Sequence, residues 1–211
     1  MGLSSAADLR STVPAAPPIG SGRYWRSCFG EHRDLLQRCE TELAPAFDAL
    51  VADVVAVFCQ GGLMMLCGNG GSAADAQHIA AEFTVRFVRD RRALRALALA
   101  TDCSSITASG NDLGFDQVFS RQVDAHGRPG DLLIGISTSG NSPNVLAAFD
   151  AARAGGIRTV ALTGAGGGRA AERADLVLAV PSGITARVQE MHILIGHALC
   201  GAVERELGLP T

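Results

Sequence analysis

The sequence predicts an α/β fold in which helices cover both faces of a parallel sheet. Three observations predict it: short apolar runs alternate with longer segments of helical spacing, polar loops follow two of those runs, and 47% of the residues are hydrophobic. Strands that are apolar on both faces belong in a sheet covered on both sides, which is typical of parallel sheets in α/β proteins.

The N-terminal part of the chain does not follow this alternation. Residues 1–23 are rich in Ser, Ala and Pro, and we expect a flexible arm there. Residues 24–211 are expected to form a single domain with extra helices. Over residues 24–60 apolar side chains recur at helical spacing, and Pro45 should break or kink this region. Because the region is too apolar to stand alone, we expect it to pack on the main domain or on another subunit.

Five apolar runs of strand length follow, at residues 63–67, 94–99, 132–136, 159–162 and 176–180. The segments between them include two Ala-rich stretches with helical spacing, 73–88 and 145–154. The last stretch, 185–207, predicts one long helix that ends before Gly208 and Pro210. Strands that alternate with helices in this way predict right-handed crossovers between parallel neighbours.

Composition excludes several classes of function. The net charge is −3 with no block of like charge, so we expect neither a nucleic-acid partner nor a membrane partner. No apolar run approaches the roughly 18 residues of a membrane-spanning helix, and no signal peptide is apparent, which predicts a cytoplasmic protein. All 18 basic residues are arginine, so mechanisms that need a lysine are excluded. The six cysteines form no C-x-x-C pair, and we expect them to be reduced.

Two of the expected strands end in polar loops, 67–72 and 137–142, and ligands gather at the carboxyl ends of strands in such sheets. The second loop carries four hydroxyl side chains and no acid, and Ser142 and Pro143 are a good N-cap and first residue for the helix that follows. The free N–H groups and the dipole of that helix start attract an anion. The loop therefore predicts a phosphate site, against the alternative of a merely polar turn. The glycines of the first loop would let its backbone approach a ligand closely, although Gly-rich turns are common.

Candidate reactive groups lie on two of the expected helices. His78 and Glu82 are four residues apart and share a helix face, which suits metal ligation or acid–base chemistry, although they could equally pair with each other or face water. In the last helix Gln189 and His197 are eight residues apart, about 80° around the helix and ~12 Å along it. They could meet one small ligand if it lay alongside the helix or if another subunit completed the site. Alone, His192 or His197 is more often a hydrogen-bonded core residue than a catalyst.

Five motifs together resemble the bacterial phosphoheptose isomerases, which are sugar-isomerase (SIS) domain proteins that act on sedoheptulose 7-phosphate. The resemblance covers about residues 29–207. The motifs are Gly68-Asn69-Gly70-Gly71-Ser72, Asp75 with His78 and Glu82, Gly110-Asn111-Asp112 with Gly114-Phe115, Gly135-Ile136-Ser137-Thr138-Ser139-Gly140-Asn141-Ser142, and Arg187-Val188-Gln189-Glu190 with His192 and His197.

The resemblance implies an SIS-type three-layer αβα sandwich with a five-stranded parallel sheet and extra N- and C-terminal helices. It also implies a homotetramer with sites at subunit interfaces. The implied enzyme is an aldose–ketose isomerase that converts sedoheptulose 7-phosphate to D-glycero-D-manno-heptose 7-phosphate through an enediol, an early step of activated-heptose biosynthesis.

Residue roles carry over by the same motifs. Glu82 and His197 are the implied catalytic pair, with Glu82 as the base at carbon and His197 serving the oxygens. One zinc per subunit is implied, with the ligands His78, Glu82, Gln189 and His197. The implied substrate-binding residues are Asn69, Gly70, Gly71, Ser72, Glu82, Asn111, Asp112, Ser137, Thr138, Ser139, Ser142 and Gln189.

Three other functions compete with this one. A non-catalytic SIS protein, either a sugar-phosphate-sensing regulator or a replication-initiator-associating relative, would keep the phosphate loop and lose the acid–base pair, whereas Glu82 and His197 are both present. An isomerase of another phosphosugar is disfavoured by the set His78, Glu82, Gln189 and His197. A nucleotide-binding Rossmann protein is excluded because the G-x-G-x-x-G spacing and the Walker lysine are missing.

Overall fold

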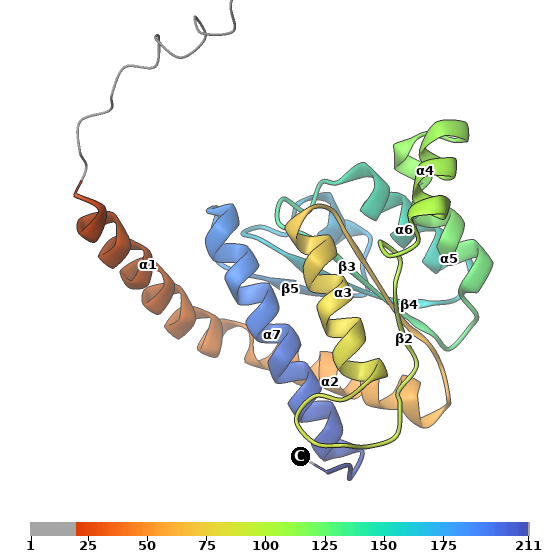
Figure 1. Ribbon diagram of the computed structural model, residues 1–211, viewed down its shortest axis with the longest axis horizontal. Coiled ribbons are helices and arrows are strands. Elements are labelled where there is room, and N and C mark those ends of the chain that lie inside the picture. Colours follow the sequence, from red (N-terminus) through yellow and green to blue (C-terminus); the bar gives the residue numbers. More distant parts are fainter. Residues whose placement is uncertain (1–19, 211) are drawn as a thin grey trace, which may run out of the picture.

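The computed structural model describes residues 20–210 and contains one parallel sheet between helical layers (Figure 1). The strand order is β2-β1-β3-β4-β5, with every neighbouring pair parallel. The strands are β1 (Met64–Gly68), β2 (Ala96–Ala98), β3 (Leu132–Ser137), β4 (Arg158–Thr163) and β5 (Leu176–Ala179). Each lies within or overlaps one of the five predicted runs, so the α/β sandwich is confirmed.

The helices form two layers, each with its own apolar core against the sheet. Buried side chains of α2 (Ala44–Cys59), α3 (Gly71–Thr84) and α7 (Thr185–Glu206) share one core with the sheet. Those of α5 (Ser120–His126) and α6 (Pro143–Ala154) share the other. The remaining elements are α1 (Ser21–Glu42), α4 (Cys103–Asp112), η2 (Phe115–Gln117) and η3 (Gly168–Glu172). Among the described helices, none is long and apolar enough to cross a membrane.

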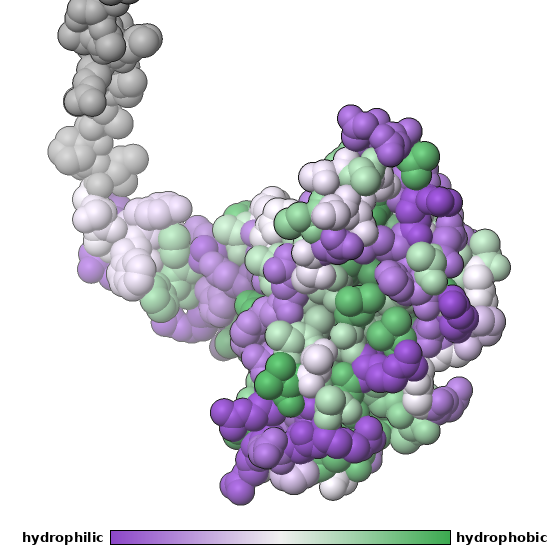
Figure 2. Space-filling model, turned by 45° about the vertical axis from the view of Figure 1, so that its right-hand side comes forward, coloured by the Kyte–Doolittle hydropathy of each residue, from purple (hydrophilic) through white to green (hydrophobic). Residues whose placement is uncertain are grey.

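The helical region before the sheet breaks where it was predicted to break. Helix α1 ends at Glu42 and α2 begins at Ala44, with Pro45 in its first turn, where the missing N–H removes no helical hydrogen bond. Helix α1 extends away from the body of the molecule (Figures 1 and 2). Leu35 and Cys39 are its only buried residues, and they pack against α7. Of the predicted arm, residues 1–19 lie outside the described part of the chain, whereas residues 21–23 already belong to α1.

The prediction for α3 was wrong at its end. Helical spacing runs on to Val88, yet the helix stops at Thr84. Its last carbonyls accept hydrogen bonds from groups further along the chain, including the backbone N–H of Leu94 at 3.1 Å to the Phe83 carbonyl. The helices α4 and α5 were not predicted. A local signal for α4 exists in Asp102, whose carboxylate caps the helix by accepting from the N–H groups of Ser104 and Ser105.

His192 is a core residue of α7, as one of the two interpretations held. It is 2% exposed, and its Nε2 lies 3.1 Å from the carbonyl oxygen of Thr163 in β4. Burial disfavours the charged imidazolium and lowers the pKa of His192 to about 4, from an ordinary value of 6.5.

This burial predicts an acid-sensitive fold. Above pH 6.5 His192 is neutral in both the folded and the unfolded chain and adds no pH dependence; between pH 6.5 and about 4 only the unfolded chain binds the proton. The free energy of unfolding should therefore fall as the pH drops through this window, with a slope approaching roughly 1.4 kcal/mol per pH unit. Urea unfolding from pH 7.5 to 4.5 measures it, with His192→Gln as the comparison. Equal slopes in both proteins would contradict the assignment.

Candidate active site

The two polar loops follow β1 and β3, the neighbouring strands at which the strand order reverses. Strands β1 and β3 are neighbours, with Gly68 opposite Ile136, but the chain leaves β1 toward β2 and leaves β3 toward β4 on the other side. The carboxyl ends of two such strands border the crevice in which α/β proteins bind ligands. Asn69 and Asn144 join the two sides, because each side-chain amide donates to the other's oxygen at 2.8 Å.

The loop 137–142 is held in a single shape before any ligand arrives. The hydroxyls of Ser137 and Ser142 lie 2.9 Å apart, and the Asn141 N–H donates to the Ser139 hydroxyl at 3.1 Å. Gly140 has φ +64°, and a side chain there would run into the carbonyl of Gly167. A loop fixed in this way loses little conformational entropy when it binds an anion.

Ser142 is the N-cap of α6 and Pro143 its first residue, as predicted. The Ser142 hydroxyl faces Ser137, however, and does not cap a backbone N–H of the helix. It therefore does not compete with an anion at the helix start. Pro143 has no N–H, and the Val145 N–H donates to the Asn144 side-chain oxygen at 3.0 Å, so the first N–H that the helix offers is that of Asn144.

Residues 164–169 support the loop 137–142. The Arg169 N–H donates to the Asn141 side-chain oxygen at 3.1 Å, and the Gly164 N–H donates to the Thr138 carbonyl at 3.0 Å.

Helices α3 and α7 run side by side in the same direction on one face of the sheet (Figure 1). Gly196 permits this close approach, since a Cβ at that position would lie 2.6 Å from Cγ1 of Ile79. At the start of α3 the Gln189 amide covers Gly71, next to the first polar loop. Two turns further along both helices, His78 faces His197.

His78, Glu82 and His197 converge between these helices. The Nε2 atoms of the two histidines are 2.8 Å apart, and Nε2 of His78 is 3.5 Å from Oε1 of Glu82. Because one imidazole nitrogen of the contact must carry a proton and the other must accept it, the two rings are held in complementary tautomers. Phe87 stacks on His197 with ring centroids 5.8 Å apart and planes 26° apart. The side chains of His78 and Glu82 are 48% and 22% exposed, so a ligand can reach them.

Among residues 20–210, no group of three or more His, Cys, Asp or Glu side chains is arranged to hold a metal ion as it stands. The Nε2 atoms of His78 and His197 are in direct contact instead. The donors themselves, two imidazoles, a carboxylate and the Gln189 amide, are nitrogen and oxygen groups of the kinds that divalent metals take. The residue types therefore fit a zinc ion, but only His78, Glu82 and His197 lie together here, whereas the Gln189 amide lies two turns away over Gly71.

Asn111 and Asp112 lie apart from this cluster, at the end of α4. The Asn111 amide donates to the Asp112 carboxylate at 2.6 Å, and both side chains are exposed. Helix α4 has no buried residue, and it stands off the sheet in Figure 1. Of the predicted substrate contacts, these two are the ones whose element the fold holds least firmly.

Sequence reasoning missed three residues of this region. Asn144 is 1% exposed and pairs with Asn69, but one asparagine at a helix start carries no distinctive signal. Phe87 was assigned to the helix predicted over residues 73–88, as one more apolar residue of its buried face. Asp75 lies within the recognised motif and was given no role; its Oδ2 is buried without a hydrogen-bond partner among the described residues. Burial raises the pKa of Asp75, and the nearby His78 opposes that shift.

Comparison with known proteins decides the family. The family model of the SIS domain matches residues 28–164. The phosphoheptose isomerase of Rhodospirillum rubrum is 55% identical over 166 residues, which cover 79% of this chain and 88% of the relative. The chain belongs to the phosphoheptose isomerases of the SIS domain family.

Solved structures agree with this membership. The phosphoheptose isomerase from Neisseria gonorrhoeae superposes with a TM-score of 0.84 at 44% identity, over 88% of this chain and 99% of that chain. The one from Francisella tularensis gives a TM-score of 0.86 at 36% identity, over 89% and 100%. The predictions of an SIS fold and of an isomerase are confirmed, and the non-catalytic alternative is not favoured.

Proposed function

We propose that the chain interconverts sedoheptulose 7-phosphate and D-glycero-D-manno-heptose 7-phosphate through an enediol, an early step of activated-heptose biosynthesis. The observation that carries the proposal is the convergence of Glu82, His78 and His197 between α3 and α7, while the loop 137–142 lies near the start of α3. An aldose–ketose isomerase needs these two parts, one to hold the phosphate and one to move protons. The names of the relatives support the heptose assignment.

The phosphate end of the substrate would bind the loop 137–142. Ser137, Thr138, Ser139 and Ser142 supply hydroxyls, and the start of α6 supplies the Asn144 N–H and a favourable dipole. The sugar would then lie along the start of α3, against Gly70, Gly71 and Ser72 and against the Gln189 amide. Asn69 would contribute backbone groups, because its side-chain amide is engaged by Asn144. Asn111 and Asp112 would reach the sugar from α4.

The chemistry would take place at Glu82 and His197. In the ketose, Glu82 removes a proton from C1 while the C2 oxygen gains a proton, which gives the enediol; the proton then returns to C2 as the C1 hydroxyl loses its own. His197 serves the oxygens of C1 and C2. Every proton that is removed is returned, so the reaction needs no redox cofactor.

We also propose that each subunit binds one zinc ion through His78, Glu82, Gln189 and His197. When bound, zinc would supply Lewis-acid polarisation of the substrate carbonyl. A carboxylate that ligates a metal is a weaker base, so Glu82 would have to exchange one role for the other during turnover.

A cytoplasmic homotetramer with sites at subunit interfaces completes the proposal. The exposed aromatic side chains Tyr24, Trp25 and Phe29 support it, being 70%, 64% and 52% exposed on a helix that extends from the body. An apolar groove of about 450 Å³ between α1, α2 and α7 offers a matching surface for a second copy. All six cysteines are free, which is typical of a reducing compartment.

The decisive variant for the reaction is Glu82→Gln. The amide has the same shape but cannot act as a base, so turnover of sedoheptulose 7-phosphate should fall by about 10²-fold or more while the protein still folds and binds the sugar phosphate. Proton NMR follows turnover, and calorimetry measures binding. Glu206→Gln, an exposed carboxylate at the end of α7, is the matched control. Near-normal turnover by Glu82→Gln would sink the assignment.

Zinc is tested by metal content as well as by activity. Protein loaded with zinc and then desalted should carry one zinc per chain by elemental analysis, and His78→Ala should carry much less, because it lacks one ligand. His126→Ala, which removes an exposed histidine of α5, should keep the metal. A chelator should lower both zinc content and turnover. Metal-free protein with full turnover would refute the zinc proposal and leave the isomerase proposal intact.

The tetramer is tested by mass in solution. Light scattering should give four times the chain mass of 21.8 kDa at micromolar concentration. Trp25→Glu combined with Phe29→Glu should lower the mass, because charges would replace the exposed aromatic surface of α1. A monomer with full turnover would contradict both the assembly and the shared sites.

A further inference from the structure

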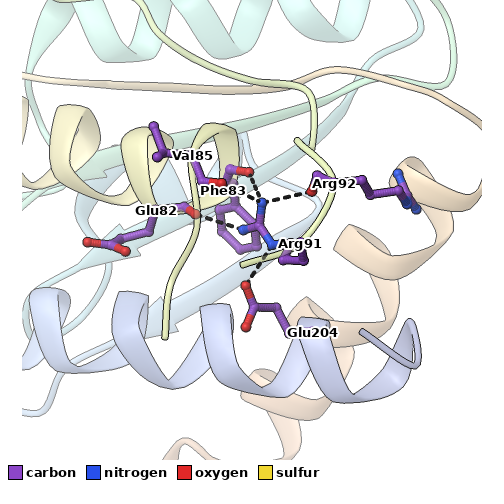
Figure 3. Close-up of polar contacts among 6 residues, drawn as sticks. All are labelled: Glu82, Phe83, Val85, Arg91, Arg92 and Glu204. Carbon is purple, nitrogen blue, oxygen red and sulfur yellow. Dashed lines mark hydrogen bonds and ion pairs between the residues drawn. The ribbon is translucent and has the colours of Figure 1, made fainter. Parts of the chain in front are cut away.

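Arg91 lies in the segment between α3 and β2, and its side chain is 1% exposed (Figure 3). Its Nε donates to Oε1 of Glu204 in α7 at 2.8 Å, and the Glu204 side chain is also 1% exposed. Neither residue belongs to a recognised motif or to the proposed reaction. A fully buried ion pair is costly to desolvate, so its position calls for an explanation.

The guanidinium also closes the end of α3. It donates to the carbonyls of Glu82 and Phe83, each at 2.7 Å, and to that of Arg92 at 3.0 Å. Carbonyls in the last turn of a helix lack donors within the helix, and a cation suits the negative end of the helix dipole. The residue whose carbonyl Arg91 holds is Glu82, so the group fixes the backbone that carries the proposed base.

The other partner fixes α7. Glu204 follows His197 by seven residues, so both lie on one face of the helix about two turns apart. Cys200 lies between them; burial, followed by the charges of Glu82 and Glu204, raises the pKa of its thiol to about 12. Phe87, from the same segment as Arg91, stacks on the His197 ring. One short segment therefore reaches both proposed catalytic residues.

Optimal stability does not explain this pair. Oε2 of Glu204 is buried without a hydrogen-bond partner in the described part of the chain. A buried ion pair that leaves an oxygen unsatisfied is often no better than two apolar side chains of similar size. The contacts of the pair instead suit it to fix the position of the end of α3 relative to α7.

We propose that Arg91 and Glu204 are positioning residues for the isomerisation: the pair holds Glu82 and His197 at their working distance. The proposal rests on the proposed function, in which these two residues move the protons. The phosphate loop lies at the other end of α3 and does not depend on the pair. Loss of the pair should therefore lower kcat and leave KM for the sugar phosphate unchanged.

The test uses the full chain with Arg91→Met and Glu204→Met combined, since removing both charges avoids an unpaired buried ion. We expect a folded protein whose kcat is about 10-fold lower or more, with KM within about 2-fold, because a small misplacement of catalytic groups is costly. The control removes the Arg158–Asp53 pair, which joins β4 to α2, as Arg158→Met with Asp53→Asn; kcat and KM should not change.

Arg91→Lys gives a second measurement if the double variant does not fold. It keeps the buried charge, but its ammonium cannot reproduce the planar fork that reaches a carboxylate and the carbonyls of Glu82, Phe83 and Arg92, so kcat should fall several-fold at unchanged KM. An unchanged kcat in folded Arg91→Lys or in the double variant, or a rise in KM alone, would overturn the proposal. Failure of the proposed function shows separately, as near-normal turnover by Glu82→Gln.

Discussion

The site depends on one topological constraint: β1 and β3 are hydrogen-bonded neighbours, but the chain leaves them in opposite directions. This brings two loops that are far apart in sequence to one crevice, and it points the starts of α3 and α6 toward the same place. Two helix starts favour an anion more than either one alone. The Asn69–Asn144 pair joins the two helix starts, so the geometry of the crevice is fixed without any ligand.

The second constraint is the close packing of α3 on α7. The eight-residue separation of Gln189 and His197 was a difficulty while α7 was considered alone. Beside α3 it becomes useful, because Gln189 reaches the helix start at Gly71 and His197 reaches His78 further along.

Features that depend on local pattern could be predicted from the sequence. The five strands follow from apolar runs, and the 137–142 loop follows from its hydroxyls and its Ser-Pro helix start. Features that depend on distant partners could not be predicted. Helix α3 ends where Arg91 and Leu94 donate hydrogen bonds to its last carbonyls. The apolar residues continue at helical spacing to Val88, so the sequence gives no sign of this end. Asn144 pairs 75 positions away, and Glu204 pairs 113 positions away. Before the fold is known, each is an ordinary polar residue of a helix.

The two halves of the site therefore differ in what holds them. The anion loop is fixed by contacts within itself and with 164–169, so its geometry survives changes in the helical layer. Glu82 and His197 lie on separate helices, which are in contact at Gly196 and are joined further along by Phe87 and by the buried Arg91–Glu204 pair. Under the proposed function, binding of the phosphate would depend mainly on one loop, whereas the barrier to proton transfer would depend on the packing of α3 on α7. Since reaction rates respond more steeply than binding to small shifts of the reacting groups, the helix–helix interface is then where this fold would set catalytic efficiency.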